Sequence, residues 1–129
     1  MVSRTIKLRN GMAEMQLRIR FDSAAHVAEF YQRLNDVVRY ESIMKEQATS
    51  ASADMYGRAI INLYELIFGE DATRSIEAWF GDNVLGMVSQ INPIISKYIE
   101  PDVVKCSAER RRKMVRDFKR TQRRARRHV

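Results

Sequence analysis

Apolar side chains recur at spacings of three and four between residues 54 and 99. This spacing places them on one face of a helix with about 3.6 residues per turn, and Gly69 and Gly81 interrupt it where glycine commonly ends a helix. The predicted inward-facing residues are Tyr56, Ile60, Leu63, Tyr64, Ile67 and Phe68, then Ala72, Ile76, Trp79 and Phe80, then Val84, Val88, Ile91, Ile95 and Tyr98 or Ile99. The pattern therefore predicts three helices that supply most of the core, with Trp79 and Phe80 at its centre.

Polar residues and one proline set the expected boundaries of these helices. Asp71 or Thr73 is expected to cap the second helix, and Asp82 or Asn83 the third. Pro93 lacks a backbone N–H and is expected to kink the third helix. Each boundary thus has a residue whose chemistry accounts for it.

The amino-terminal segment alternates apolar and polar residues on both sides of an Asn-Gly pair at positions 10 and 11. Asn-Gly is the preferred pair for a two-residue type I′ turn, so Arg9 is expected to pair with Met12 and Lys7 to lie opposite Glu14. The expected apolar face holds Val2, Ile6, Leu8, Ala13, Met15, Leu17, Ile19 and Phe21. An isolated hairpin is marginal in water, so this face must be covered by the helices or by strands of another subunit.

A second helical pattern follows the hairpin, from about residue 24 to residue 47. Asp22 and Ser23 stand just before it and are expected to cap it. Its apolar stripe holds Val27, Phe30, Tyr31, Leu34, Val37 or Val38 and Met44. The small polar residues that follow predict a break near Thr49 to Asp54.

The end of the chain differs from the rest in its pattern. Pro101 is expected to mark the end of the packed body, and beyond it only Val104, Met114, Val115 and Phe118 form a thin apolar stripe. Residues 1–104 are therefore predicted to form the hairpin plus helical body, and residues 105–129 a basic tail. The predicted fold is α+β, with an N-terminal β-hairpin, a four-helix, mainly α body, and a basic C-terminal helix or tail.

The chain has the length of one domain, 129 residues, and 45% of them are hydrophobic. At this size folding buries roughly two thirds of the surface of the unfolded chain, so a real core is expected. No apolar run approaches the ~18 residues of a membrane span, and the amino terminus does not resemble a signal peptide. A lone Cys106 agrees with a reducing compartment. We therefore expect a soluble, cytoplasmic protein that does not bind membranes.

Charge is distributed unevenly along the chain, whose net charge is +7. Residues 105–129 hold twelve Lys and Arg against two acids, whereas residues 1–104 hold eleven bases and fourteen acids. The basic residues proposed to contact a partner are Arg110, Arg111, Arg112, Lys113, Arg116, Lys119, Arg120, Arg123, Arg124, Arg126 and Arg127. Such a segment could bind nucleic acid through its phosphate charges, dock on an acidic protein surface, or simply keep the protein soluble. Because Phe118 is its only aromatic residue, base stacking is not indicated, and protein docking or solubility is favoured.

Catalytic and metal-binding groups are sparse in the sequence. The histidines are His26 and His128, and neither they nor Cys106 match the spacing of a zinc site or a nucleophile–base pair. Glu70 and Asp71 are adjacent acids at an expected helix start, where they complement the helix dipole. The sequence therefore predicts a protein that is not an enzyme and has no cofactor or metal.

The five glycines do not form a phosphate-binding loop. Gly11 belongs to the expected hairpin turn, and Gly69 and Gly81 to helix ends. Gly57 and Gly86 fall inside helical patterns, where glycine costs about 1 kcal/mol relative to alanine. We interpret these two as places where helices approach closely.

Methionine offers adaptable apolar contacts. Met44, Met55 and Met87 are the candidates for binding an apolar stripe of a partner, although methionine at helical spacing is more often part of a core.

Several short segments carry a resemblance to a known family: Lys7-Leu8-Arg9-Asn10-Gly11, Leu66-Ile67-Phe68-Gly69-Glu70-Asp71, Phe80-Gly81-Asp82-Asn83 and the arginine-rich ending. In this order they resemble small tail assembly chaperones of long-tailed bacteriophages. The resemblance implies a hairpin before a helical body and no catalytic activity. It also implies binding to the tape-measure protein and tail tube subunits in the host cytoplasm during tail assembly. Some members are also made in a longer, frameshifted form, and this chain is similar to the shorter product.

The leading hypothesis is thus a non-enzymatic tail assembly chaperone. One rival is a small nucleic-acid-binding protein that uses the basic tail without sequence preference, and another is a structural component of the virion. The uncovered edge of the hairpin also suggests a homo-oligomer.

Overall fold

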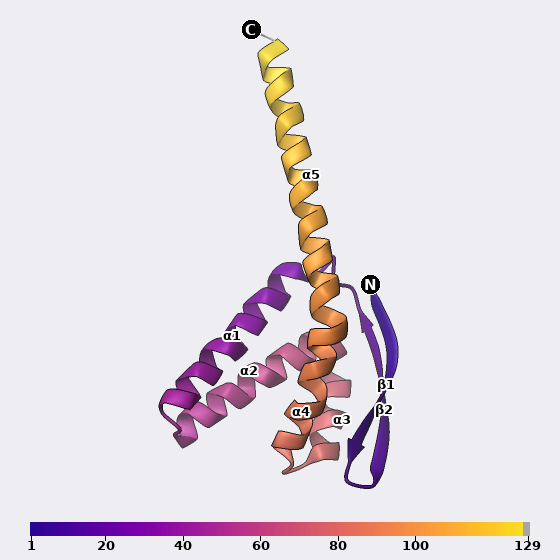
Figure 1. Cartoon of the computed structure of the whole chain (residues 1–129), viewed down its shortest axis with the longest axis vertical. Helices are drawn as coiled ribbons and strands as arrows, with labels where there is room; N and C mark the ends of the chain where they lie inside the picture. Colours follow the sequence, from indigo (N-terminus) through magenta and orange to yellow (C-terminus); the bar gives the residue numbers. More distant parts are fainter. Residues whose placement is uncertain (128–129) are drawn as a thin grey trace.

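The structure is a computed structural model that describes residues 1–127. Its elements are β1 (Val2–Asn10), β2 (Ala13–Phe21), α1 (Val27–Glu46), α2 (Ser50–Phe68), α3 (Glu70–Phe80), α4 (Val84–Ile94), the π-helical turn η1 (Ile95–Ile99) and α5 (Glu100–Arg127). The prediction of an α+β fold, with an N-terminal hairpin, four helices and a long basic C-terminal helix, is confirmed (Figure 1).

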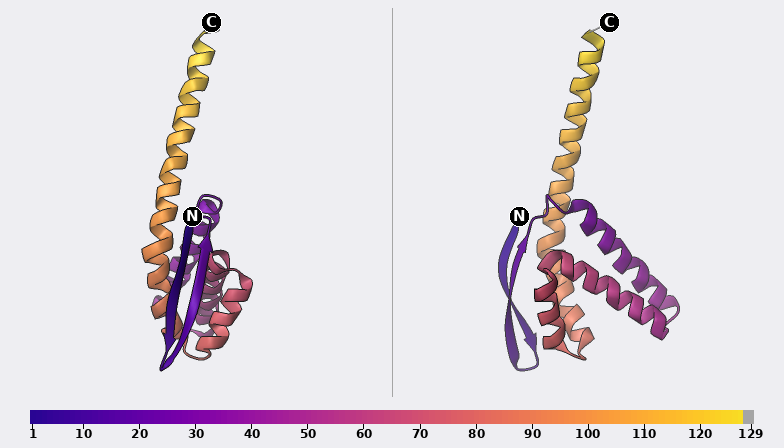
Figure 2. Two further views of the ribbon diagram at one scale, coloured as in Figure 1. Left: turned by 90° about the vertical axis from the view of Figure 1, so that its right-hand side faces the viewer. Right: turned by 180° about the vertical axis from the view of Figure 1, so that it is seen from behind.

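The hairpin stands against the helices, and α1 and α2 form an antiparallel pair that extends to the other side (Figure 1). The two views of Figure 2 show that α5 continues far beyond the rest of the molecule as a single rod. The start of β1 lies beside the point where α5 leaves the other elements. The molecule therefore has a packed end and a projecting end.

The core draws on every described element. Its fully or nearly fully buried large side chains are Leu8, Ile19, Phe21, Phe30, Ile60, Tyr64, Ile67, Ile76, Ile91, Ile99 and Val103. Tyr64 lies at the centre, where its hydroxyl donates a hydrogen bond of 2.7 Å to Oδ1 of Asn92. Burial raises its pKa well above the usual value of a tyrosine. Phe80 is buried in the core as predicted, but Trp79, predicted beside it, is only half-buried. Val84, predicted to face inward, is exposed.

The hairpin has the predicted faces but a different register. Arg9 pairs with Glu14 and Asn10 with Ala13, so the pairing is displaced by two residues from the expected one, and Lys7 lies opposite Gln16. Because side chains alternate with a period of two, a displacement of two leaves the apolar face unchanged.

The turn explains the different register. Its central residues are Gly11 and Met12, and only Gly11 has a positive φ, 64°. This matches a type II′ turn, which needs glycine at its first central position. Asn10 is thereby free to bond the helices: its amide donates to the carbonyl of Trp79 at 3.0 Å, and its oxygen accepts from the Asn83 amide at 3.2 Å. Tertiary contacts thus determine the turn type, which local sequence preference predicts differently.

The first two helices begin at residues other than those predicted. α1 begins at Val27, after His26, and Asp22 and Ser23 do not cap it. The hydroxyl of Ser23 bonds a residue of α5 instead. The break between α1 and α2 comes earlier than expected, because Thr49 and Ser52 form a reciprocal capping box that starts α2.

The ends of α3 and α4 follow the prediction in part. Gly69 and Gly81 end helices with positive φ values of 87° and 56°. Asn83 caps α4 by accepting from the Gly86 N–H at 3.1 Å. α3 begins directly after Gly69, so neither Asp71 nor Thr73 caps it.

The interpretation of Gly57 and Gly86 as points of close helix approach is wrong. A Cβ at residue 57 would meet no atom within 4 Å. A Cβ at residue 86 would collide with the side chain of Asn83, which is the residue that caps α4. Gly86 therefore makes room for a cap.

The two prolines do not end helices. Pro93 lies within α4, and Pro101 lies in the first turn of α5. Between them, η1 has a π-helical bond from the Glu100 N–H to the Ile95 carbonyl. Proline lacks the N–H that a regular α-helical hydrogen bond needs, and a π-helical turn accommodates this loss by bonding residues five apart. The prediction that Pro101 ends the packed body is therefore wrong, since Val103 is fully buried and Cys106 packs against the core.

Thr73 offers a test of the core. Its hydroxyl oxygen is buried and has no hydrogen-bond partner among the described residues. Replacing it in Thr73→Val keeps the shape and removes the unpaired polar group, so we expect the free energy of unfolding to rise by about 1 kcal/mol. Urea unfolding measures this change. Thr73→Ala is the control, because it removes the same hydroxyl but also a methyl group, and a loss of stability in Thr73→Val would contradict the assignment.

Candidate partner-binding helix and the groove at its root

The root of α5 is part of the core. Ile99 and Val103 are fully buried, and Cys106, one turn further on, is half-buried against the core. The start of α1 also contacts α5 here. The position and direction of the helix are thus fixed by the same apolar contacts that stabilise the fold.

Asp102 joins this root to the start of the hairpin. Its carboxylate accepts a hydrogen bond of 2.5 Å from the fully buried hydroxyl of Ser23 and lies 3.4 Å from the amino group of Met1. The Ser23 bond, with the nearby positive charges, lowers the pKa of Asp102. Three segments distant in sequence therefore meet at one ionised carboxylate.

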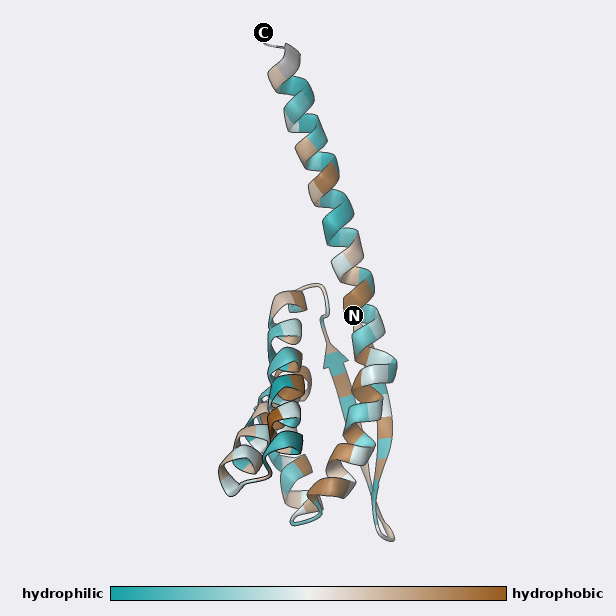
Figure 3. Cartoon of the chain, turned by 60° about the vertical axis from the view of Figure 1, so that its left-hand side comes forward, coloured by the Kyte–Doolittle hydropathy of each residue, from teal (hydrophilic) through white to brown (hydrophobic). Residues whose placement is uncertain are grey.

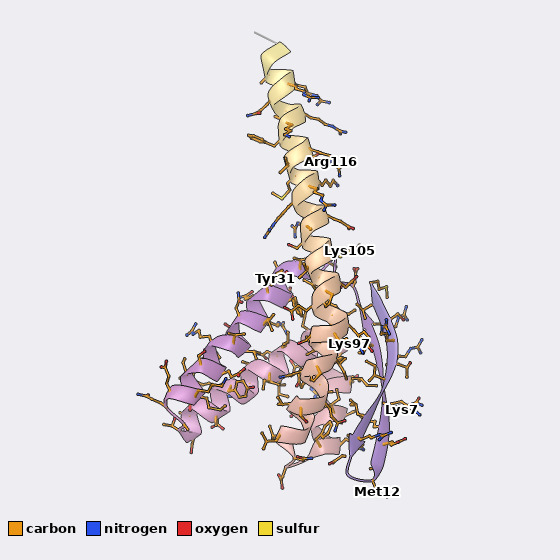
Figure 4. The ribbon with its side chains drawn as sticks, viewed as in Figure 1. Lys7, Met12, Tyr31, Lys97, Lys105 and Arg116 are labelled. Atoms are coloured by element: carbon orange, nitrogen blue, oxygen red, sulfur yellow. The ribbon has the colours of Figure 1, made fainter. Side chains whose placement is uncertain are left out.

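The distal segment of α5, residues 109–127, extends away from the rest of the molecule (Figure 4). Every side chain described there, from Glu109 to Ala125, is exposed. These include the predicted contact residues Arg110, Arg111, Arg112, Lys113, Arg116, Lys119, Arg120, Arg123 and Arg124. Arg126 and Arg127 belong to the helix, but their side chains lie outside the described part, as does His128 altogether. The structure thus presents the basic residues on one exposed helix.

Apolar side chains and most of the bases occupy different sides of the distal segment. Successive helical residues are rotated by about 100°, so Met114, Val115 and Phe118 share one side, which we call the distal stripe. Their side chains are 65%, 52% and 63% exposed. The opposite side carries Arg112, Lys113, Arg116, Arg120, Arg123 and Arg124. Arg111 lies within the stripe, and Arg110 and Lys119 flank it. Figure 3 shows this segment as mostly hydrophilic with a few apolar residues.

The bases of the distal segment are not neutralised within the chain. From residue 109 to residue 124, no Lys or Arg forms an ion pair with another described residue. Several lie four residues apart, such as Arg112, Arg116 and Arg120, and like charges at that spacing destabilise a helix. The segment is therefore suited to contact with negative charge from outside.

A shallow hollow of about 450 Å³ lies between β1 and the helix at the root of α5, and we call it the root groove. Its walls are Ser3 and Arg4 of β1, and Lys97, Tyr98, Pro101 and Lys105 of the helix. The guanidinium carbon of Arg4 lies 4.2 Å from the centre of the Tyr98 ring, within the range of a cation–π contact. The root groove is thus lined by positive charge at the base of a basic helix.

The three candidate methionines differ in their exposure. Met55, at the start of α2, is 46% exposed, and Met44, near the end of α1, is half-buried. Met87 is 6% exposed and belongs to the core, as methionine at helical spacing often does.

Other reactive side chains remain apart. His26 stacks on Phe21 with ring centres 5.7 Å apart, and its Nδ1 lies 4.0 Å from the Glu29 carboxylate. Glu70 and Asp71 occupy the first turn of α3, as the helix dipole favours. Among residues 1–127, no three His, Cys, Asp or Glu side chains gather in a way that could hold a metal ion. Within the same residues, no helix is long and apolar enough to cross a membrane.

No known family model, curated protein or solved structure matches the chain. Sequence reasoning found the basic residues of α5 but missed the root groove, because Arg4 and Tyr98 are distant in sequence and neither belongs to a recognisable motif. A cation–π pair between an edge strand and a π-helical turn leaves no signal in sequence spacing.

Asp102 predicts a specific dependence of stability on pH. Its pKa is lower in the folded chain than its ordinary value of 3.8, so the carboxylate stabilises the fold above that pH, and this stabilisation is lost as the pH falls through the lowered folded-state pKa. We expect Asp102→Asn to reduce the free energy of unfolding by about 1 kcal/mol at neutral pH, with a difference from the unsubstituted chain that shrinks below about pH 4.

Urea unfolding between about pH 7 and about pH 3 measures this dependence. Asp54→Asn, at an exposed position in α2, is the control. A difference between Asp102→Asn and the unsubstituted chain that stays constant over the whole range would contradict the assignment.

Proposed function

We propose that this chain is a non-enzymatic tail assembly chaperone of a long-tailed bacteriophage, which binds the tape-measure protein or tail tube subunits in the host cytoplasm. The family enters through the resemblance of the short segments described above. What supports a binding function independently of that resemblance is the distal segment of α5.

A free-standing helix of this kind favours a binding role. Most helical stability in proteins comes from packing of an apolar face, and the distal stripe has no such packing among the described residues. Like charges along the opposite side oppose the helix further. A partner that covers Met114, Val115 and Phe118 and brings acidic side chains to the bases would remove both costs. This is the recognition mode in which an amphipathic helix is laid into a groove or against other helices.

A nucleic-acid-binding function is the second candidate. The observation that favours it is the preponderance of arginine over lysine on the exposed distal segment, since arginine binds phosphate through two parallel hydrogen bonds. The distal stripe favours the protein partner, because contacts with phosphate depend on charge and do not cover the exposed apolar side chains of Met114, Val115 and Phe118.

The proposed function is tested by co-expression and affinity capture with the neighbouring gene products, among which the proposal expects a tape-measure protein and a tail tube protein. We expect the double variant Val115→Glu/Phe118→Glu to reduce capture at least tenfold, because it places negative charge on the apolar contact. Val84→Glu/Leu85→Glu is the matched control, since these two residues are 53% and 84% exposed on α4, which lies far from the distal segment (Figure 1). Capture of neither protein by the unsubstituted chain, or full capture by the double variant, would overturn the proposal.

Deletion of residues 119–129 separates the two candidates. If the chain binds nucleic acid, this deletion should abolish most of an affinity for a DNA or RNA duplex that falls steeply with added salt. If the chain is the proposed chaperone, the unsubstituted protein shows no such affinity, and fluorescence anisotropy with a labelled duplex measures it directly.

A further inference from the structure

We infer that the free edge of β1 beside the root groove binds an extended acidic peptide segment as an added β-strand. This inference rests on the proposed function, because it names the chemistry of a client segment, and it assigns that segment to a second surface.

The backbone of the β1 edge has unused hydrogen-bonding groups. The N–H of Arg9 donates to Oε1 of Gln90 at 2.7 Å, and its carbonyl accepts from Nε2 of the same side chain, so both groups point away from β2. Backbone direction alternates along a strand, so the corresponding groups of Lys7, Thr5 and Ser3 point to the same edge. No backbone hydrogen bond joins these three residues to any described residue beyond β2. The edge is therefore open over about five residues.

Gln90 shows how this edge accepts a partner. Its side-chain amide bonds the N–H and the carbonyl of one β1 residue, as a neighbouring strand would do. It closes the edge at Arg9, next to the hairpin tip, and leaves the remainder uncovered. An added strand would thus continue a pairing that the protein already makes with itself.

The root groove gives this edge a second wall. The helix residues Lys97, Tyr98 and Lys105 face β1 across the hollow of about 450 Å³. Lys97 and Lys105 come from the helix, and Lys7 comes from the hairpin (Figure 4). A strand added to β1 lies about 5 Å from it and presents alternate side chains to opposite sides. One set of side chains would therefore enter the groove.

The charge of the groove selects an acidic peptide. Arg4, Lys97 and Lys105 line it, and its one acid, Asp102, is already engaged by Ser23 and by the amino group of Met1. The peptide that fits has Glu or Asp at alternate positions, which face these bases. Single-stranded nucleic acid fits less well, because the face of Tyr98 that could stack on a base is covered by Arg4.

A labelled peptide of about eight residues with Glu and Val in alternation tests the inference by fluorescence anisotropy on the full chain. We expect saturable binding, and protection of the amides of Ser3, Thr5 and Lys7 from hydrogen exchange in the complex. The matched probe is the same peptide N-methylated at alternate residues, on the edge that would pair with β1. It keeps the charge but lacks the donors for strand addition, so we expect at least tenfold weaker binding. Equal binding of both peptides would overturn the inference.

Two pairs of variants locate the site. Thr5→Pro removes an outward N–H without breaking a bond to β2 and should weaken binding at least tenfold, whereas Gln16→Pro makes the same change on the β2 edge and should have little effect. Lys97→Glu/Lys105→Glu should also weaken binding at least tenfold, and Arg58→Glu/Arg74→Glu, at exposed positions in α2 and α3, changes the net charge equally as its control. Circular dichroism establishes that each variant is folded.

The remaining outcomes also decide the inference. Equal losses in a variant and its control would overturn it, as would displacement of the peptide by a single-stranded oligonucleotide of the same charge at equal or lower concentration. Because this assay contains no tail protein, it is independent of the capture experiment. Peptide binding without capture would overturn the proposed clients alone, and capture without peptide binding would overturn the edge site alone.

Discussion

The structure depends on the burial of one face of a two-stranded hairpin against the helices. The hairpin in turn covers apolar side chains of the helices that would otherwise face water. An isolated two-stranded sheet is at best marginally stable in water, and its inner face here includes Leu8, Ile19 and Phe21, all almost fully buried. Polar contacts hold it at both ends, through Asn10 at the tip and through the Ser23–Asp102 bond at the other end. The hairpin is therefore fixed to the helices at both ends as well as through its apolar face.

Periodicity in the sequence predicts which residues face inward, because burial of apolar surface dominates the choice of face. The inner face of the hairpin and most of the buried residues of α2 follow from it directly. Periodicity does not predict the hairpin register, because a shift of two residues satisfies the same pattern, and the choice is made by Asn10 bonding to residues of α3 and α4. It also does not predict that Ser23 leaves its cap position to bond Asp102, since both roles suit a serine.

The prolines show a different limit of sequence reasoning. Local rules predict a kink at Pro93 and the end of the packed body at Pro101, but the chain is helical from Val84 to Arg127, with η1 between the two prolines. Burial of Ile95, Ile99 and Val103 outweighs the lost backbone bonds, and the π-helical turn accommodates them. The exposed bases of α5 were predictable because charge in a single segment needs no tertiary information. The root groove was not, because its two walls meet only when β1 and the helix are brought together.

Continuity of the helix also fixes the direction of the distal stripe. In an unbroken α-helix, Phe118 is rotated by about 60° from Val103, which faces the core. Met114, at about 20°, and Phe118 therefore lie toward the side of α5 that faces the core at its root, whereas Val115, at about 120°, lies further round the helix. A partner on the stripe would approach the start of α1, which contacts α5 at its root. Burial of Val103 thus determines where a partner can bind more than twenty Å further along the helix, at about 1.5 Å per residue.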